Sequence, residues 1–167
     1  EEHQAVREAA KNFAESECKS GVIERDTHQK VGFEQLKKLG KLGFMGMMVD
    51  PKYGGSGMDT LSDVMAIEEI AKIDASISVA CSVNNRLVCW GLEKFANEEQ
   101  KIKYLVPLAK GEKIGAFCLS EPEAGSDANS QRTTAIDKGD HYLLNGTKNW
   151  ITNGSTASTY LVVAQTD

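Results

Sequence analysis

Two short segments contain the residues whose types and spacing could do chemistry. The first, residues 116–127 (AFCLSEPEAGSD), runs from a small apolar strand into Glu121 and Pro122. Pro122 fixes its own φ, lacks an N–H and disfavours helical backbone at Glu121, so the strand must turn there. Gly125 and Ser126 then offer successive backbone N–H groups around a residue that adopts a positive φ without steric cost. This turn is either a candidate phosphate cradle or a surface hairpin without a ligand.

The second segment is residues 149–154 (NWITNG). We expect it to be a strand, in which side-chain alternation would place Trp150 and Thr152 on the same face. A flat apolar ring would then lie beside a hydroxyl donor. A large flat ligand that carries both ring heteroatoms and phosphates would use these two segments together.

Both segments resemble the flavin-contacting segments of the acyl-CoA dehydrogenase family, particularly of its short-chain (butyryl-CoA) members. The resemblance is carried by residues 117–126 (FCLSEPEAGS) and 150–152 (WIT). Supporting matches occur in the expected order along the chain, at residues 42–46, 53–57, 98–105 and 144–148. The similarity is therefore nearly end to end.

The resemblance implies a reaction as well as a fold. A carboxylate would remove the α-proton of an acyl-CoA while the β-hydride passes to N5 of FAD, giving the trans-2-enoyl-CoA. The electrons would pass to an electron-transfer flavoprotein, and the full-length protein would be a homotetramer. Two alternatives stay open, namely an acyl-CoA oxidase of the same fold that uses oxygen, and a non-catalytic CoA-binding or assembly subunit.

The resemblance also assigns residues to the cofactor, which are Phe117, Cys118, Leu119, Ser120, Gly125, Ser126, Trp150, Ile151 and Thr152. Gly125 and Ser126 would contact the pyrophosphate, with Ser126 also near the CoA portion of the substrate. Trp150 would pack beside the flavin. The Thr152 hydroxyl would reach toward N5, where a pre-oriented donor stabilises developing charge.

No catalytic residue is assigned in this chain. By resemblance, the general base is a glutamate of a C-terminal helical domain, and residues 1–167 end before it. Glu121 and Glu123 lie beside the proposed phosphate turn, but a carboxylate next to Pro122 is better interpreted as fixing that turn. The chain is therefore expected to be a fragment that does not turn over alone.

Residues 74–90 are apolar on nearly every side, which predicts a buried helix. One interpretation is a central core helix. The resemblance gives another, because the corresponding helix of the family lines the acyl cavity. The candidate substrate-binding residues on it are Val79, Ala80, Val83 and Asn84.

The hydrophobic periodicity changes after Gly111, from helical to strand-like. Helices are expected over residues 4–19, 33–42, 61–73, 74–90 and about 97–110, with a polar connection at 23–32. Strands are expected over residues 114–119, 132–136, 141–145, 148–152 and 160–165. The predicted fold class is α+β: an N-terminal all-α helical bundle (1–112), followed by the first part of an antiparallel β-barrel or sheet domain (113–167).

Composition narrows the function further. The net charge of −5 is spread over mixed positive and negative residues, which argues against a nucleic-acid partner. No segment reads as a membrane span or a signal peptide, so the expected location is a bacterial cytoplasm or, in a eukaryote, the mitochondrial matrix. The four cysteines form no C-x-x-C pair, and the three histidines have no metal-ligand spacing. No metal is expected.

Overall fold

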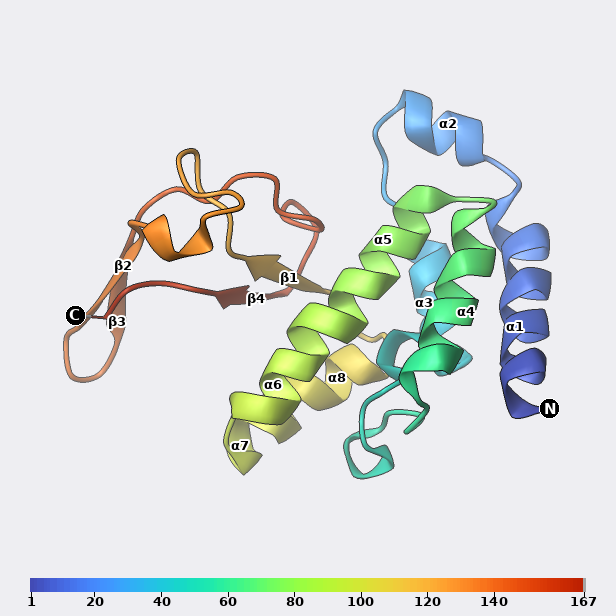
Figure 1. The fold of residues 1–167 in the computed structure, drawn as a ribbon, viewed down its shortest axis with the longest axis horizontal. Helices are drawn as coiled ribbons and strands as arrows, with labels where there is room; N and C mark the ends of the chain where they lie inside the picture. Colours follow the sequence, from blue (N-terminus) through green and yellow to red (C-terminus); the bar gives the residue numbers. More distant parts are fainter. Residues whose placement is uncertain (167) are drawn as a thin grey trace.

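Helices occupy the first part of the chain and strands the last part, as a computed structural model of the chain shows for residues 1–166 (Figure 1). Asp167, which the sequence places in the second domain, lies outside these described residues. The helical elements are α1 (Glu2–Phe13), η1 (Ala14–Cys18), α2 (Val22–Thr27), α3 (Phe33–Lys41), η2 (Phe44–Gly46), η3 (Pro51–Tyr53), α4 (Thr60–Ala71), α5 (Ala75–Val83), η4 (Asn84–Cys89), α6 (Trp90–Phe95), α7 (Glu98–Gln100), η5 (Lys101–Leu105), α8 (Val106–Ala109) and η6 (Ala128–Ser130). The strands are β1 (Gly115–Cys118), β2 (Thr134–Asp137), β3 (Tyr142–Asn145) and β4 (Thr159–Val162). The predicted α+β class is confirmed.

Side-chain caps stabilise the starts of three of the α-helices. Asp59 accepts the Ser62 N–H at the start of α4, and Asp74 accepts the N–H groups of Ser76 and Ile77 at the start of α5. Asn97 and Gln100 form a reciprocal capping box at α7. Such caps satisfy N–H groups that have no partner within the helix, so these helix starts follow from the local sequence.

The region expected to be a polar connection, residues 23–32, is partly helical. α2 forms there because Arg25 is held by partners outside the segment. Its guanidinium donates to the Asp74 carboxylate at 2.8 Å, to the Ser20 carbonyl at 2.9 Å and to the Cys18 carbonyl. The expectation of an irregular connection was wrong because Asp74 is distant in sequence and becomes a neighbour only in the folded chain.

Two apolar clusters form the core. The first lies among α1, η1, α3, η2, α4 and α5, and the second among η4, α6, η5, α8 and the segment before and within η3. Phe117 of β1 and Leu161 of β4 pack against the second cluster. This packing holds the strands to the helices and fixes β1 beside the helix that runs through α5, η4 and α6 (Figure 1).

The strands form two separate pairs. β2 and β3 are antiparallel, with Thr134 opposite Asn145, as the predicted antiparallel sheet requires. β1 and β4 instead run parallel, with Gly115 opposite Thr159. The antiparallel expectation is corrected for this pair: a long connection containing the β2–β3 hairpin separates the two strands, and parallel pairing needs such a crossover.

Residues 148–152 do not form the expected strand. Trp150 has a φ of 58° and Asn153 a φ of 64°, both in the left-handed region. Backbone hydrogen bonds form turns here: the Gly154 N–H donates to the Ile151 carbonyl, and the Thr156 N–H donates to the Asn153 carbonyl. Trp150 and Thr152 therefore do not share a strand face. We call residues 148–158 the joint loop, because its contacts connect the strands to α5.

Candidate functional site

The two segments with chemical potential lie next to each other. The Asn149 N–H donates to the Ser120 carbonyl at 2.8 Å. Lys148 Nζ donates to the Leu119 carbonyl at 2.9 Å. The segment that follows β1 and the start of the joint loop are thus hydrogen-bonded to each other. The two segments predicted to contact one ligand are therefore neighbours in the folded chain.

A mostly buried ion pair fixes the turn after β1. Lys148 Nζ lies 2.7 Å from Glu121 Oε1, and the two side chains are 10% and 7% exposed. Glu121 also accepts the backbone N–H groups of Arg132 (2.6 Å) and Thr133 (2.9 Å). The Lys148 ammonium, followed by these other donors, lowers the pKa of Glu121 to about 2. Glu121 is a structural anion, in agreement with its interpretation as a turn-fixing residue.

The proposed phosphate turn is open. Gly125 and Ser126 are exposed, and a Cβ added at Gly125 would meet no atom within 4 Å. Gly125 does not use the positive φ that a glycine could adopt there. Two backbone hydrogen bonds between Glu121 and Ala124 form the turn, so the turn does not require a positive φ at Gly125. Space for an anion remains over its backbone.

A cavity of about 800 Å³ lies between α2, the start of α5 and the joint loop. Val79 and Ala80 of α5 line one wall, and Thr152 and Asn153 of the joint loop line another. The helical bundle and the strand region thus contribute predicted substrate residues and a predicted cofactor residue to one space. This cavity is the candidate functional site.

Charged side chains of α2 and of the cap of α5 also line the cavity. Among them, Asp74 is held by Arg25 and by the start of α5. Burial alone would raise the pKa of Asp74, but hydrogen bonds from Ser76, Arg25 and Ile77 outweigh it and lower the pKa. Asp74 is therefore committed to holding α2 against α5 and is unsuited to accept a proton at neutral pH.

Two of the four substrate residues predicted on the helix over residues 74–90 lie elsewhere. Val83 packs against the second apolar cluster. Asn84 is fully buried: Nδ2 donates to the carbonyls of Met45 (2.8 Å) and Leu108 (3.3 Å), and Oδ1 accepts the Gly115 N–H at 2.9 Å. The placement of Asn84 in a substrate pocket is corrected, because its amide connects buried backbone segments.

The predicted full burial of the helix over residues 74–90 is also corrected. Val79, Leu87 and Trp90 are 48%, 40% and 52% exposed. Val79 faces the cavity, and Trp90 contacts only the edge of the Phe95 ring, so this side of the helix is incompletely covered. Apolar composition on every side showed that the helix could be buried, but it could not show which side packs within residues 1–166.

The predicted flavin residues differ in accessibility. Cys118 is buried, which raises the pKa of its thiol, whereas Phe117, Leu119 and Ser120 are half-buried. In the joint loop, Ile151 and Thr152 are half-buried, and Trp150 is 95% exposed. Among residues 1–166 no hydrogen bond joins the Thr152 hydroxyl to another group. An unpacked indole and an unpartnered hydroxyl are therefore available to a ligand.

Sequence reasoning missed Asn153. Its amide Nδ2 donates to the Gly115 carbonyl of β1 at 3.0 Å and to the Ala80 carbonyl of α5 at 3.4 Å. In the sequence, Asn153–Gly154 reads as a simple turn. The only signal of a further role was its place directly after Thr152.

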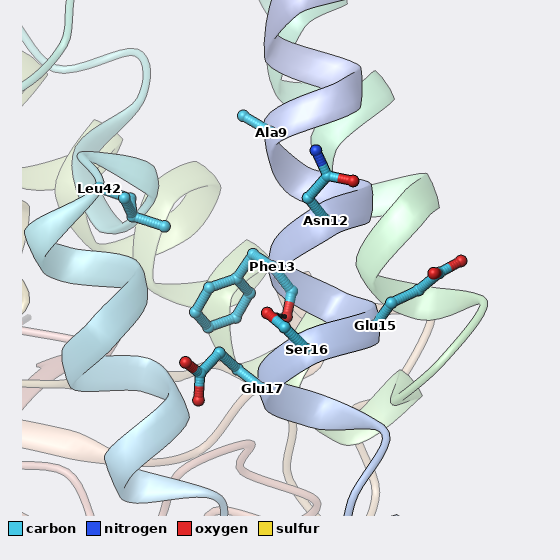
Figure 2. A pocket seen from close by; sticks show the side chains of 7 residues that line it. All are labelled: Ala9, Asn12, Phe13, Glu15, Ser16, Glu17 and Leu42. Atoms are coloured by element: carbon cyan, nitrogen blue, oxygen red, sulfur yellow. Dashed lines mark hydrogen bonds between the residues drawn. The ribbon is translucent and has the colours of Figure 1, made fainter.

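A second hollow of about 680 Å³ lies between α3 and the helix formed by α1 and η1. Figure 2 shows Phe13 and Glu17 pointing toward the helix that precedes Leu42. Phe13 belongs to the first apolar cluster, and Glu17 pairs with Lys38 of α3. None of the predicted site residues lines this hollow, so we do not place the site there.

Metal ligands and membrane-spanning helices are absent from the described part of the chain. No three His, Cys, Asp or Glu side chains among residues 1–166 are grouped so that they could hold a metal ion. The helices of the same residues are too short or too polar to cross a bilayer.

Comparison with known proteins identifies the family. The description "Acyl-CoA dehydrogenase, N-terminal domain" matches residues 1–112, and "Acyl-CoA dehydrogenase, middle domain" matches residues 116–167. The short-chain specific acyl-CoA dehydrogenase of Clostridium acetobutylicum is 45% identical over 99% of this chain and 44% of its own length.

Solved structures agree with this match. Butyryl-CoA dehydrogenase from Megasphaera elsdenii is 42% identical with a TM-score of 0.92, over 99% of this chain and 44% of that one. A glutaryl-CoA dehydrogenase from Mycobacterium smegmatis in complex with FADH2 is 34% identical with a TM-score of 0.95, over 100% of this chain and 43% of that one. The chain thus spans less than half the length of these relatives, and it belongs to the acyl-CoA dehydrogenase family.

Proposed function

We propose that the protein containing this chain is an FAD-dependent oxidoreductase that introduces an α,β double bond into a short-chain acyl-CoA. The observation that carries the proposal is the cavity in which Val79 and Ala80 of α5 face Thr152 and Asn153 of the joint loop. It gives an acyl chain an apolar wall next to the segment that resembles a flavin site. Relatives with 42–45% identity bear the names butyryl-CoA dehydrogenase and short-chain specific acyl-CoA dehydrogenase.

The residues present fit FAD. The exposed Trp150 ring offers a flat apolar surface, and the unpartnered Thr152 hydroxyl, two residues further along the chain, offers a donor. The open backbone at Gly125 and Ser126 leaves room for a pyrophosphate. When bound, FAD supplies the acceptor for the β-hydride of the substrate.

The residues of this chain would bind and orient the reactants. We propose that the Thr152 hydroxyl donates a hydrogen bond toward the reacting edge of the cofactor, where it stabilises charge that develops there. Trp150 would pack on the ring system, and Phe117, Cys118, Leu119 and Ser120 would form the adjoining backbone wall, with Ile151 behind it. Val79 and Ala80 would exclude water from the acyl chain, and Ser126 would contact the CoA portion.

Other parts of the activity belong to the whole protein. We propose that the general base is a carboxylate outside residues 1–167, since Asp74 in the cavity is paired with Arg25. We also propose that electrons pass to an electron-transfer flavoprotein, that the whole protein is a homotetramer, and that residues 1–112 and 113–167 belong to separate domains.

An anaerobic titration of the whole flavoprotein with butyryl-CoA tests the proposal. We expect the oxidised flavin absorbance to bleach and to return when an electron acceptor is added. A rapid return in air without another acceptor would indicate an oxidase instead. If FAD is bound but no acyl-CoA of any chain length bleaches it, the proposed reaction is wrong and a non-catalytic role gains support.

A further inference from the structure

Asn153 lies where three parts of the molecule meet. It is 9% exposed, and its Nδ2 donates to the Gly115 carbonyl at 3.0 Å and to the Ala80 carbonyl at 3.4 Å. Gly115 begins β1, and Ala80 lies on α5 in the cavity wall. One amide group therefore connects the joint loop to both the helical bundle and the strands.

The backbone of Asn153 is bound as well. Its carbonyl accepts the N–H groups of Thr156 (3.0 Å) and Ala157 (2.7 Å). Its φ of 64° lies in the left-handed region, which asparagine and glycine tolerate better than other residues. Asparagine meets both demands at once, because it tolerates this backbone and carries two N–H donors that can reach two carbonyls. Glycine would meet only the first demand, and aspartate would place a carboxylate against carbonyl oxygens.

Thr152, the preceding residue, has no comparable support of its own. Its hydroxyl has no hydrogen-bond partner within residues 1–166, and its side chain lines the cavity. The position of that hydroxyl relative to the α5 wall consequently depends on how the backbone at residue 153 is held. The same contact determines the distance between the loop and Ala80.

We propose that Asn153 is a positioning residue, which holds the Thr152 hydroxyl in place against the α5 wall of the cavity. This inference rests on the proposed function, since it assigns Asn153 an effect on the reaction through Thr152. A solely structural role would instead be limited to satisfying two buried carbonyls. The two roles differ in whether the effect of replacing Asn153 requires the Thr152 hydroxyl.

A double-mutant cycle in the whole flavoprotein separates them. Asn153→Gly keeps the positive φ accessible and removes the amide, and Thr152→Val removes the hydroxyl at nearly constant shape. The rate of flavin reduction by butyryl-CoA is measured in anaerobic stopped flow. We expect Asn153→Gly alone to slow reduction by about tenfold or more, because small misplacements of reacting groups have large effects on rate. In the Thr152→Val background the same change should slow it by less than about twofold.

Asn129→Gly is the matched control, because Asn129 is exposed in η6 and the same substitution is made there. Its reduction rate should stay within about twofold of the original protein. Equal slowing by Asn153→Gly in both Thr152 backgrounds would overturn the positioning role. So would an unchanged rate in Asn153→Gly.

Amide hydrogen exchange gives a readout that is independent of turnover. Asn153→Gly should raise exchange in residues 149–158 by about tenfold or more over Asn129→Gly, because the loop then opens without breaking its bonds to Ala80 and Gly115. Asn153→Asp should behave similarly. Unchanged exchange in this loop would overturn the proposal even if the enzyme is active. Failure of the original protein to bleach with any acyl-CoA would instead count against the proposed function, and the exchange result would still decide whether Asn153 holds the loop.

Discussion

At the residue scale, the turn after β1 depends on one carboxylate. Glu121 accepts hydrogen bonds from Lys148, Arg132 and Thr133, and so connects the turn to the start of β2 and to the joint loop. Lys148 in turn donates to Leu119 and Gln131. Because both charged groups are mostly buried, each depends on the other for compensation. A motif that could suggest acid–base chemistry is thus part of the framework that places the candidate cofactor segments.

Glu121→Gln should lower the unfolding temperature at neutral pH, since it leaves the Lys148 ammonium without a counter-charge. The pKa of Glu121 is about 2 in the folded chain, below its ordinary value of 4.5. A depressed pKa means that the carboxylate stabilises the fold above the ordinary value, and that this contribution is lost as the pH falls toward 2. The difference in unfolding temperature between the two proteins should therefore shrink between about pH 5 and pH 2.

Glu123→Gln is the control for this measurement. Glu123, like Glu121, forms an ion pair, in this case with Arg132. The side chains of Glu123 and Arg132 are 72% and 80% exposed. Exposed pairs contribute little to stability, so this variant should melt close to the original protein at every pH. A pH-independent difference for Glu121→Gln would contradict the assignment of its carboxylate as the titrating group.

At the scale of elements, Asn84 connects η4 to the segment of η2, to α8 and to β1. Asn84→Ala should destabilise the protein by about 1–3 kcal/mol, because it leaves the buried Gly115 N–H without its acceptor. Urea-induced unfolding measures this as a lower midpoint. Asn129→Ala, at an exposed asparagine, should change stability by no more than about 0.5 kcal/mol. Equal midpoints for the two variants would show that the Asn84 amide is not needed by the backbone around it.

The contact between β1 and η4 is close enough to require a glycine. A Cβ at Gly115 would lie 2.6 Å from Val88 Cγ1 and 2.9 Å from Val88 Cβ. Gly115→Ala should therefore cost about 1–3 kcal/mol through overpacking. Adding Val88→Ala removes the two methyl groups at 2.6 and 3.0 Å and leaves only the approach to Cβ at 2.9 Å, so the double variant should lose less than the sum of the two single losses in urea unfolding. Strictly additive losses would mean that β1 does not approach the helix this closely.

At the scale of the whole molecule, the four cysteines report on the integrity of both core clusters. Cys18 and Cys81 lie in the first cluster, Cys89 lies in the second, and Cys118 is buried in β1. Burial raises the pKa of Cys18 to about 11 and of Cys81 to about 12, and it raises the pKa of Cys89 and Cys118 as well. The thiolate is the reactive form, so all four thiols should be slow to react in the folded protein.

A thiol-specific disulfide reagent at about pH 8 tests this expectation, since free thiols exposed to water react readily there. We expect the thiols of these four cysteines to react promptly in denaturant and hardly at all under native conditions. A single fast thiol in the native protein would identify a cluster that opens readily, and isolating it by Cys→Ser substitution would show which one.

Much of the helical part could be predicted from local sequence. Asp59, Asp74 and Asn97 cap α4, α5 and α7, and each cap bonds to N–H groups only two or three residues away, so local sequence favours a helix start at these positions. The segments 117–126 and 150–152 likewise indicate the family from their sequence alone. The fold alone places Thr152 in one cavity with Val79 and Ala80, because these residues are distant in sequence.

The sequence by itself determined the α+β class, the helix starts and the family, because these depend on periodicity, caps and motifs formed by residues close together in the chain. Only the tertiary structure decided that α2 is helical, that residues 148–152 turn, that β1 and β4 are parallel, and that Asn84 and Asn153 join separate elements. Each of these depends on where a polar group finds its partner once it is buried. For α2, Asn84 and Asn153 a partner lies tens of residues away, at Asp74, Gly115 and Ala80 respectively, so no local pattern identifies it.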